Sequence, residues 1–280
     1  MTNVGFLGVG NMGKAIINGI AKSKLENIEL TAFDINKEQI NSIKNITITV
    51  CEDENELVLG AKYLFLCVKP QIMKDVLKKI STHIRPDTVI ISIAAGISGE
   101  HIQDEIQQYK SSASLISSLV LPKVKVIQVM PNTPLMLGEG AVALAKFEPT
   151  TDDELKFVEK IFSASGKTAI LPKEKMNEII AINGSSPAFI YLFAKAFIEY
   201  ATENGLDSLT CKQLFAQTLI GSAKMLTDSG FSIDELIKQV SSPGGTTLAG
   251  LERLYEGNLV GVTKNACTSC LKRAIELGGR

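Results

Sequence analysis

The 280-residue chain has little of what disulfide frameworks and membrane spans require. Its five cysteines are an odd number and lie scattered, which fits reduced thiols in a cytoplasm better than paired ones. No apolar run reaches the roughly 18 residues of a transmembrane helix. No basic segment followed by an apolar one marks a signal peptide at the N-terminus. We therefore expect a cytoplasmic protein without a membrane partner.

An excess of one charge is also missing, because 29 Lys and Arg face 30 Asp and Glu. This balance argues against a nucleic-acid partner, which favours basic surfaces. The two histidines, His83 and His101, fall away from the predicted strand ends, so we expect surface positions and no Ser/His/Asp centre. Cys267 and Cys270 have the spacing of a metal site, but no second pair follows. Buried thiols and no metal are therefore expected.

Short apolar segments alternate with helical spacing in the first half of the chain, a pattern typical of a parallel sheet covered on both faces. The predicted strands are residues 3–7, 28–33, 63–68, 88–93 and 125–129, with further ones at 141–145 and 168–171. Several end in residues that suit turns: Gly8, Pro70, Gly96 and Pro131-Asn132. Ligands of such sheets sit outside the carboxyl ends of the strands, so these residues should converge on one site.

The second half is almost entirely helical in pattern. Helices are predicted at residues 175–183, 187–204, 209–228, 232–240, 246–255 and 259–277. Their apolar residues point all round, which indicates packing against a second copy of the chain. The sequence thus predicts an α/β protein with an N-terminal α/β domain over 1–165 and a C-terminal all-helical dimerisation domain over 166–280.

A glycine-rich loop follows the first predicted strand: Gly8-Val9-Gly10-Asn11-Met12-Gly13. Gly8 allows a tight turn, Gly10 lets the backbone approach a pyrophosphate, and Gly13 lets the helix pack closely on the strand. The spacing alone is a weak signal, but here a strand precedes it and a helix and second strand follow. We therefore expect residues 1–165 to form a Rossmann dinucleotide-binding domain that holds a nicotinamide dinucleotide, with its phosphates at the helix N-terminus.

Asp34 ends the second predicted strand, where an acidic side chain accepts hydrogen bonds from the adenosine ribose. The same carboxylate would repel a 2′-phosphate, so Asp34 favours NADH over NADPH. The alternative is an exposed loop aspartate without a ligand.

Small residues interrupt the helical half at residues 183–189 and 240–248. The second segment carries Pro243-Gly244-Gly245 directly before Thr246 and Thr247, which begin a predicted helix. Its free amides suit a small carboxylate, and threonine hydroxyls can hydrogen-bond a neighbouring nitrogen. A plain helix–helix turn with a threonine cap remains an equal alternative.

Several strings together resemble the pyrroline-5-carboxylate reductase family along nearly the whole chain. They are VGFLGVGNMGKAI near the N-terminus, CVKP at 67–70, SIAAG at 92–96, MPNTP at 130–134, GSSPAF at 184–189, GSAKML at 221–226 and VSSPGGTTLAGL at 240–251. The resemblance implies reduction of the cyclic imine Δ1-pyrroline-5-carboxylate to L-proline, the last step of proline synthesis, by NADPH or NADH. It also implies a homodimer with interlaced helical halves, and rings of dimers.

The resemblance further implies roles for particular residues. Cofactor contacts fall on Gly8, Gly10, Asn11, Met12, Gly13, Asp34, Val68, Lys69, Pro70, Ala94, Ala95, Gly96 and Asn132. Substrate contacts fall on Ser186, Gly245, Thr246 and Thr247, which makes residues 166–280 the substrate domain as well. Thr247 takes the catalytic role by hydrogen-bonding the ring nitrogen, and in a dimer this loop can serve the partner's cofactor.

The chain departs from the family at Asn183, where many members carry Ser, and at Asp34, where several carry small polar or basic residues. A second interpretation is another imine or β-hydroxyacid reductase of the same build. β-Hydroxyacid dehydrogenases use a lysine of the second domain as the acid/base. Only Lys195 and Lys224 could take that role here, and neither lies in that family's glycine-rich setting. A third interpretation is a non-catalytic dinucleotide sensor, but such a protein would not need the Pro243-Gly244-Gly245 loop before Thr246.

Overall fold

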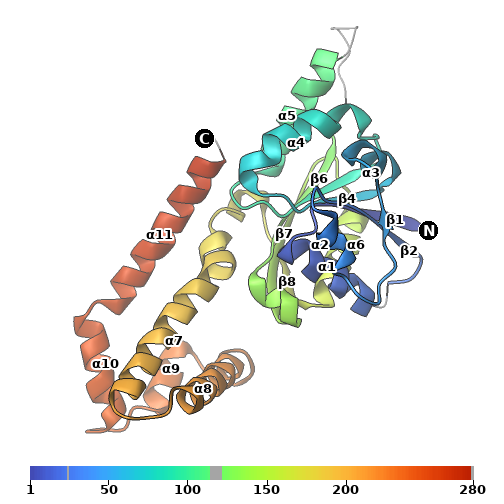
Figure 1. Ribbon diagram of the computed structural model, residues 1–280. Helices are drawn as coiled ribbons and strands as arrows, with labels where there is room; N and C mark the ends of the chain where they lie inside the picture. Colours follow the sequence, from blue (N-terminus) through green and yellow to red (C-terminus); the bar gives the residue numbers. More distant parts are fainter. Residues whose placement is uncertain (24, 114–121, 279–280) are drawn as a thin grey trace. The chain divides into compact units, whose positions relative to one another are not determined.

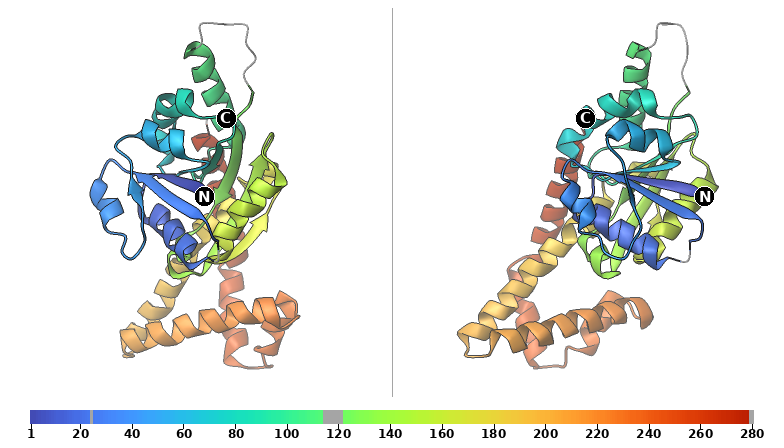
Figure 2. Two further views of the ribbon diagram at one scale, coloured as in Figure 1. Left: turned by 90° about the vertical axis from the view of Figure 1, so that its right-hand side faces the viewer. Right: turned by 45° about the vertical axis from the view of Figure 1, so that its right-hand side comes forward.

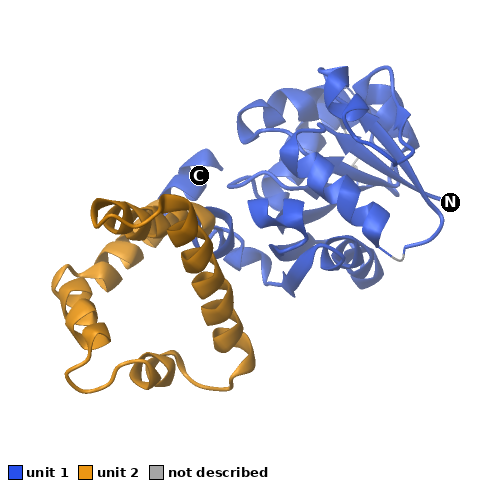
Figure 3. Ribbon diagram, turned by 60° about the horizontal axis from the view of Figure 1, so that its bottom comes forward, with its two compact units in different colours: residues 1–185, 270–280 blue, residues 186–269 orange. Residues whose placement is uncertain are grey.

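The computed structural model describes residues 1–23, 25–113 and 122–278. The chain divides into two compact units (Figure 3). Unit 1 comprises Met1–Ser185 and Cys270–Arg280, and unit 2 comprises Ser186–Ser269. Each unit is described separately below. No helix among the described residues is long and apolar enough to cross a membrane.

Unit 1 is built on an eight-stranded sheet with the order β3-β2-β1-β4-β5-β6-β7-β8. The strands are β1 Thr2–Leu7, β2 Ile28–Phe33, β3 Thr49–Val50, β4 Tyr63–Leu66, β5 Val89–Ser92, β6 Lys125–Met130, β7 Gly140–Phe147 and β8 Gly166–Ile170. All predicted strands are present. The short β3 was missed because both of its residues are exposed and form no apolar run.

The sheet is parallel as predicted except at one pair of strands. β6 and β7 are antiparallel, with Val129 opposite Leu144, whereas the other neighbouring strands are parallel. The connection between β6 and β7 holds only a short 3₁₀ helix, η3 Thr133–Leu137. A parallel crossover needs a dozen or more residues, usually including an α-helix, so this connection returns the chain antiparallel.

Helices cover both faces of the sheet (Figures 1 and 2). On one face α1 Asn11–Lys22 packs with α6 Asp152–Ser163. On the other lie α3 Glu54–Gly60, α4 Met73–Ile80 and α5 Gly99–Ala113. Successive residues of β5 alternate between the two cores, Ile91 in the first and Ile90 in the second. Burial on both faces explains why these strands read as continuous apolar runs. The short α2 Lys37–Asn41 follows β2.

The division into units comes later than the predicted boundary after Ser165. β8 pairs with β7 from Gly140 opposite Gly166 onward, and therefore stays with the sheet. The helix predicted at 175–183 is instead a 3₁₀ turn, η4 Lys173–Lys175, and a π-helix, η5 Ile180–Ser185. The final residues of the chain also return to unit 1.

Unit 2 consists of α7 Ser186–Glu203, α8 Ser208–Asp228, α9 Ile233–Gln239, α10 Thr246–Glu256 and the first part of α11 Leu259–Leu277. These bounds follow the predicted helices closely. The predicted interruption at 183–189 does not exist, because the π-helix runs directly into α7. Many large apolar side chains of α7 and α8 are exposed in the single chain, among them Tyr191, Leu192, Leu209 and Leu214.

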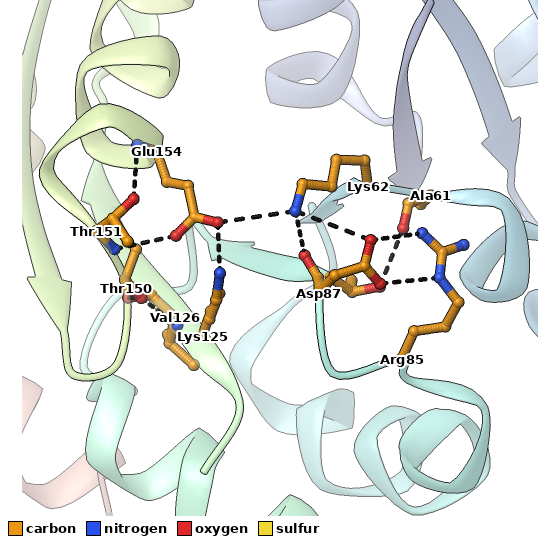
Figure 4. A network of polar contacts seen from close by, with 10 residues as sticks. Ala61, Lys62, Arg85, Asp87, Lys125, Val126, Thr150, Thr151 and Glu154 are labelled. Carbon is orange, nitrogen blue, oxygen red and sulfur yellow. Dashed lines mark hydrogen bonds and ion pairs between the residues drawn. The ribbon is translucent and has the colours of Figure 1, made fainter. Parts of the chain in front are cut away.

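A network of ion pairs joins the amino ends of neighbouring strands (Figure 4). Lys62, just before β4, lies 3.7 Å from Glu154 of α6 and 3.9 Å from Asp87, just before β5. Lys125, the first residue of β6, donates to the same Glu154 at 2.7 Å. The network lies at the amino ends of the strands, so it leaves their carboxyl ends open for a ligand.

Candidate functional site

A cavity of about 580 Å³ opens at the carboxyl ends of β1 and β4. The strand order reverses between these two neighbours, since β2 and β3 lie on one side and β5 and β6 on the other. Such a switch point is where open α/β sheets bind their ligands. Predicted cofactor residues that line the cavity are Gly8, Gly10, Asn11, Met12, Asp34, Val68 and Lys69.

The glycines of the loop differ in what surrounds them. Gly8 has φ +92°, and a Cβ there would lie 2.8 Å from the carbonyl oxygen of Cys67. A Cβ on Gly13 would lie 2.7 Å from the carbonyl oxygen of Gly8. A Cβ on Gly10 would meet no atom within 4 Å. Gly8 and Gly13 thus serve the fold, whereas Gly10 leaves space that a pyrophosphate can use.

The Asp34 carboxylate closes the glycine loop. It accepts hydrogen bonds from the Val9 amide at 2.6 Å and from the Asn36 amide at 2.8 Å. Each carboxylate oxygen retains a lone pair for a further donor. Asp34 is therefore both a clamp on the loop and an acceptor in the cavity.

The remaining predicted cofactor residues lie at the same sheet edge without lining the cavity. Pro70 begins the 3₁₀ helix η1 Pro70–Ile72 after β4. Ala94, Ala95 and Gly96 follow β5, and the Ala94 amide donates to the Ser92 hydroxyl at 3.3 Å. Their place after neighbouring parallel strands brings them to one edge, as predicted.

Asn132, which follows β6, is 9% exposed. Its Oδ1 accepts from the Ala141 amide at 2.9 Å. The carbonyl of Ala141 in turn accepts from the side-chain amide of Asn183 at 3.2 Å. Asn132 therefore holds the β6–β7 connection, and this oxygen is engaged within the protein.

One face of α4 completes the cavity and was not predicted from the sequence. Asp75, Val76 and Lys79 of α4 line it, together with Ile72 just before α4 and Glu54 at the start of α3. Their spacing of three and four residues is that of one helix face, and this periodicity after β4 was the available signal. Lys79 pairs with Glu54 at 3.1 Å. The charge of Lys79 is thus balanced within the protein.

Cys67 also lines the cavity. Burial raises the pKa of its thiol well above the ordinary range, so it remains protonated at neutral pH. A protonated thiol is a poor nucleophile. Among the residues that the structure describes, no three or more His, Cys, Asp or Glu side chains form a metal-binding group.

The loop between α9 and α10 has the predicted turn. Gly244 has φ +71°, and the Gly245 amide donates to the Ser242 carbonyl at 3.0 Å. The Gly245 amide is thus engaged within the turn, and its predicted contact with a carboxylate stays a prediction. Thr246 and Thr247 begin α10, and the first amides of a helix have no partner within it. Both threonines are exposed in the single chain.

The remaining predicted residues of the helical half are Ser186, Cys267 and Cys270. Ser186 is the first residue of α7, not part of a loop. A second hollow of about 890 Å³ lies between α9 and α10 and includes Gly245, but not Thr246 or Thr247. Cys267 and Cys270 are half-buried, so the expectation of buried thiols is met only in part in the single chain.

The residues at the sheet edge fit a dinucleotide. A glycine loop, a helix N-terminus at Asn11 and an acidic side chain after β2 surround one cavity. No protein atom lies within 4 Å of the place where a Cβ on Gly10 would be, so the space above Gly10 is open to phosphate groups. This arrangement suits hydride chemistry supplied by a bound cofactor.

Comparisons with known proteins agree with this geometry. Residues 173–277 match the family model described as pyrroline-5-carboxylate reductase dimerisation, and residues 3–96 match NADP oxidoreductase coenzyme F420-dependent. Pyrroline-5-carboxylate reductase 3 of Danio rerio is 31% identical, covering 99% of this chain and 92% of its own. The Methanosarcina acetivorans pyrroline-5-carboxylate reductase is 31% identical, covering 98% and 97%.

A solved structure extends the similarity to three dimensions. The crystal structure of Plasmodium falciparum pyrroline carboxylate reductase with NADP bound has a TM-score of 0.84 and 28% identity, covering 99% of this chain and 98% of that one. The match thus includes both the sheet and the helical half. The chain belongs to the pyrroline-5-carboxylate reductase family and is an NAD(P)-dependent oxidoreductase.

Proposed function

We propose that this enzyme reduces Δ1-pyrroline-5-carboxylate to L-proline, with the cofactor in the cavity of unit 1 and the substrate at the start of α10. The observation that carries the proposal is the cavity at the β1–β4 switch point, with open space above Gly10 and the Asp34 carboxylate beside it. The intact Pro243-Gly244-Gly245 turn before α10 supports the substrate assignment.

The chain's own groups hold and orient the reactants. The amides at the start of α1 face the phosphates, and Asp34 accepts from the ribose hydroxyls. When bound, the reduced nicotinamide supplies a hydride to the imine carbon. The Val68-Lys69-Pro70 and Ala94-Ala95-Gly96 segments are the proposed surroundings of that ring.

At the substrate, the amides of Thr246 and Thr247 bind the carboxylate, and the Thr247 hydroxyl hydrogen-bonds the ring nitrogen. Ser186 is a further proposed contact. A protonated imine is already electrophilic, so orientation and electrostatics supply most of the rate enhancement. The reaction then needs no catalytic histidine, in agreement with a chain that has only two.

We propose NADH as the preferred cofactor. The Asp34 carboxylate would repel a 2′-phosphate at the ribose end. Glu54 and Asp75 also line the cavity, and Lys79 is paired with Glu54. Lys69 also lines the cavity, so three carboxylates and two ammonium groups leave its lining with a net negative charge, which disfavours a 2′-phosphate.

The proposed working form is a homodimer, with rings of dimers as the larger assembly. Exposed apolar side chains on α7 and α8 support an interface there, since a stable monomer rarely exposes such patches. The proposed compartment is the cytoplasm. All five cysteines are free thiols, which suits a reducing environment.

The test is the loss of reduced-nicotinamide absorbance with NADH and with NADPH, each with and without Δ1-pyrroline-5-carboxylate. We expect substrate-dependent oxidation with both, and a higher kcat/KM with NADH. Oxidation of the reduced cofactor by the carbonyl form of a β-hydroxyacid or by an unrelated imine, without reduction of pyrroline-5-carboxylate, would replace this proposal by the second reductase interpretation. Cofactor binding without any turnover would favour a sensor.

A further inference from the structure

The end of α11 packs against the loop that follows β5. Residues from Cys270 onward belong to unit 1, coloured with it in Figure 3. Ala274, at 4% exposed, is the one buried residue of α11. The neighbouring Lys272 is exposed, so only one side of this last turn is covered.

The partner of Ala274 is Gly96, and the approach is backbone to backbone. Gly96 has φ +80°, and a Cβ there would lie 2.7 Å from the Ala274 carbonyl oxygen and 3.1 Å from Cβ of Leu277. A Cβ on Gly278 would in turn collide with the carbonyl oxygen of Gly96. Small residues on both segments are therefore required for this contact.

The loop is held on its other side by the sheet. The Ile93 amide donates to the Leu66 carbonyl at 3.4 Å, and the Ile97 amide to the Ala94 carbonyl at 3.4 Å. Ala94 is 4% exposed. Both of these hydrogen bonds are long, so the contact with α11 adds to what holds the loop.

We propose that the last turn of α11, through Ala274, Leu277 and Gly278, is a positioning element that holds the Ala94–Gly96 loop in the conformation that receives the nicotinamide ring. This inference rests on the proposed place of the nicotinamide. It assigns a role in cofactor binding to residues far along the chain from the Rossmann motifs. These residues act through the loop and do not themselves contact the reacting atoms.

Two ligands separate this role from general stability. NADH carries the nicotinamide, whereas ADP-ribose carries only the part of the cofactor that reaches Gly8–Gly13 and Asp34. In Ala274→Leu, the added side chain displaces the loop, because overpacking shifts neighbouring backbone. We expect the Kd of NADH to rise about tenfold, and the Kd of ADP-ribose to change by less than about twofold.

Lys272→Leu is the matched control, since it adds the same side chain at an exposed position of the same turn. Neither Kd should change in it. Leu277→Ala removes packing without adding volume, and decides the question if Ala274→Leu does not fold. It should raise the Kd of NADH about threefold and leave that of ADP-ribose unchanged.

Equal losses for both ligands would assign α11 a purely structural role and overturn the proposal, as would unchanged NADH binding in folded variants. The measurement is equilibrium binding, so it does not depend on the substrate. A chain that fails to reduce pyrroline-5-carboxylate but shows the selective loss of NADH would refute the proposed function and leave this inference standing.

Discussion

The side-chain amide of Asn183 donates a hydrogen bond to the main-chain carbonyl of Met130, with 2.6 Å between nitrogen and oxygen. The same amide also reaches the carbonyl of Ala141. Asn183 thus joins the π-helix η5 to the ends of β6 and β7, beside the Asn132 segment. A Cβ on the next residue, Gly184, would collide with the terminal methyl of Met130, so the contact is close along its length.

Asn183→Asp tests this clamp. The carboxylate cannot donate and would face two carbonyl oxygens, while Oδ1 of Asn183 has no hydrogen-bond partner among the described residues. We expect the free energy of unfolding at pH 8 to fall by about 2–4 kcal/mol. The loss should shrink as the pH falls, because a protonated carboxyl can donate. Denaturant unfolding at fixed protein concentration measures both effects.

Asn204→Asp is the matched control. Asn204 is exposed, and its amide donates to the Tyr200 carbonyl at 2.8 Å. Its replacement should change the free energy of unfolding by no more than about 0.5 kcal/mol. A similar loss of unfolding free energy in both variants would contradict the view that the buried clamp at Asn183 causes the effect.

Gly8 and Gly10 should respond in opposite ways to added side chains. Gly8→Ala meets the Cys67 carbonyl in a left-handed conformation, so we expect a loss of about 1–3 kcal/mol in stability. Gly10 has φ −70° and open space, so Gly10→Val should cost less than about 1 kcal/mol. Gly10→Val should nevertheless raise the Kd of NADH about tenfold, because the pyrophosphate needs that space.

Urea unfolding and NADH fluorescence titration on the same two variants make this comparison. Wild-type NADH affinity in Gly10→Val would place the pyrophosphate elsewhere. Wild-type stability in Gly8→Ala would mean that the turn can relax around a Cβ.

The sequence allowed the prediction of features that depend on local chain signals. The glycine loop, the strand before it and Asp34 lie within one β-α-β segment, and Asp34 does reach the cavity. The helices of unit 2 also followed from periodicity and from Pro-Gly punctuation. These elements are specified by residues close together in the chain.

Contacts between distant segments could not be predicted in this way. Nothing near Ala274 indicates that it will meet Gly96, and nothing near Asn183 indicates Met130. The antiparallel β7 follows from the length of its connection, which became informative only once β6 and β7 were known to be neighbours. Such contacts depend on the packed fold, so single-sequence patterns carry no signal for them.

The charge of Asp34 should determine the preference for NADH over NADPH. Asp34→Asn keeps an oxygen that can accept from the Val9 amide but removes the charge. We expect NADPH affinity to rise about tenfold relative to NADH. Glu38→Gln, which removes an exposed carboxylate outside the cavity, is the control and should leave the ratio unchanged. Fluorescence titration with both cofactors measures the ratio. Wild-type enzyme that binds NADPH more tightly would contradict the role of Asp34.

The lowered pKa of the Glu154 carboxyl should make the stability of the protein depend on pH. Burial alone would raise the pKa of its carboxyl, but hydrogen bonds from Lys125 and Thr151 outweigh burial and lower it. A folded-state pKa below the unfolded value stabilises the fold above about pH 4.3, and this contribution is lost as the pH falls through the folded pKa. Glu154→Gln should therefore destabilise the protein by about 1–3 kcal/mol at pH 7 and progressively less below pH 4.3.

The control for Glu154 is Glu178→Gln. Glu178 pairs with Lys175 at 3.1 Å, but its side chain is 43% exposed, so the loss should stay below about 1 kcal/mol. Parallel stability curves for wild type and Glu154→Gln across pH 3–7 would show that the carboxylate contributes nothing through its charge.

Thr247 is the residue that the proposed chemistry singles out. Thr247→Ala removes the hydroxyl proposed to bind the ring nitrogen, while the cofactor cavity in unit 1 remains unchanged. We expect kcat to fall about tenfold or more, because one oriented hydrogen bond to the reacting group is lost. The Kd of NADH should stay within about twofold of wild type.

Thr247→Ser is the control: it keeps a hydroxyl and should recover most of the turnover. Thr247 is exposed and at the first turn of α10, so both variants should fold as wild type does. Wild-type turnover in Thr247→Ala would remove this hydroxyl from the mechanism and leave the α10 amides as the substrate's principal anchors.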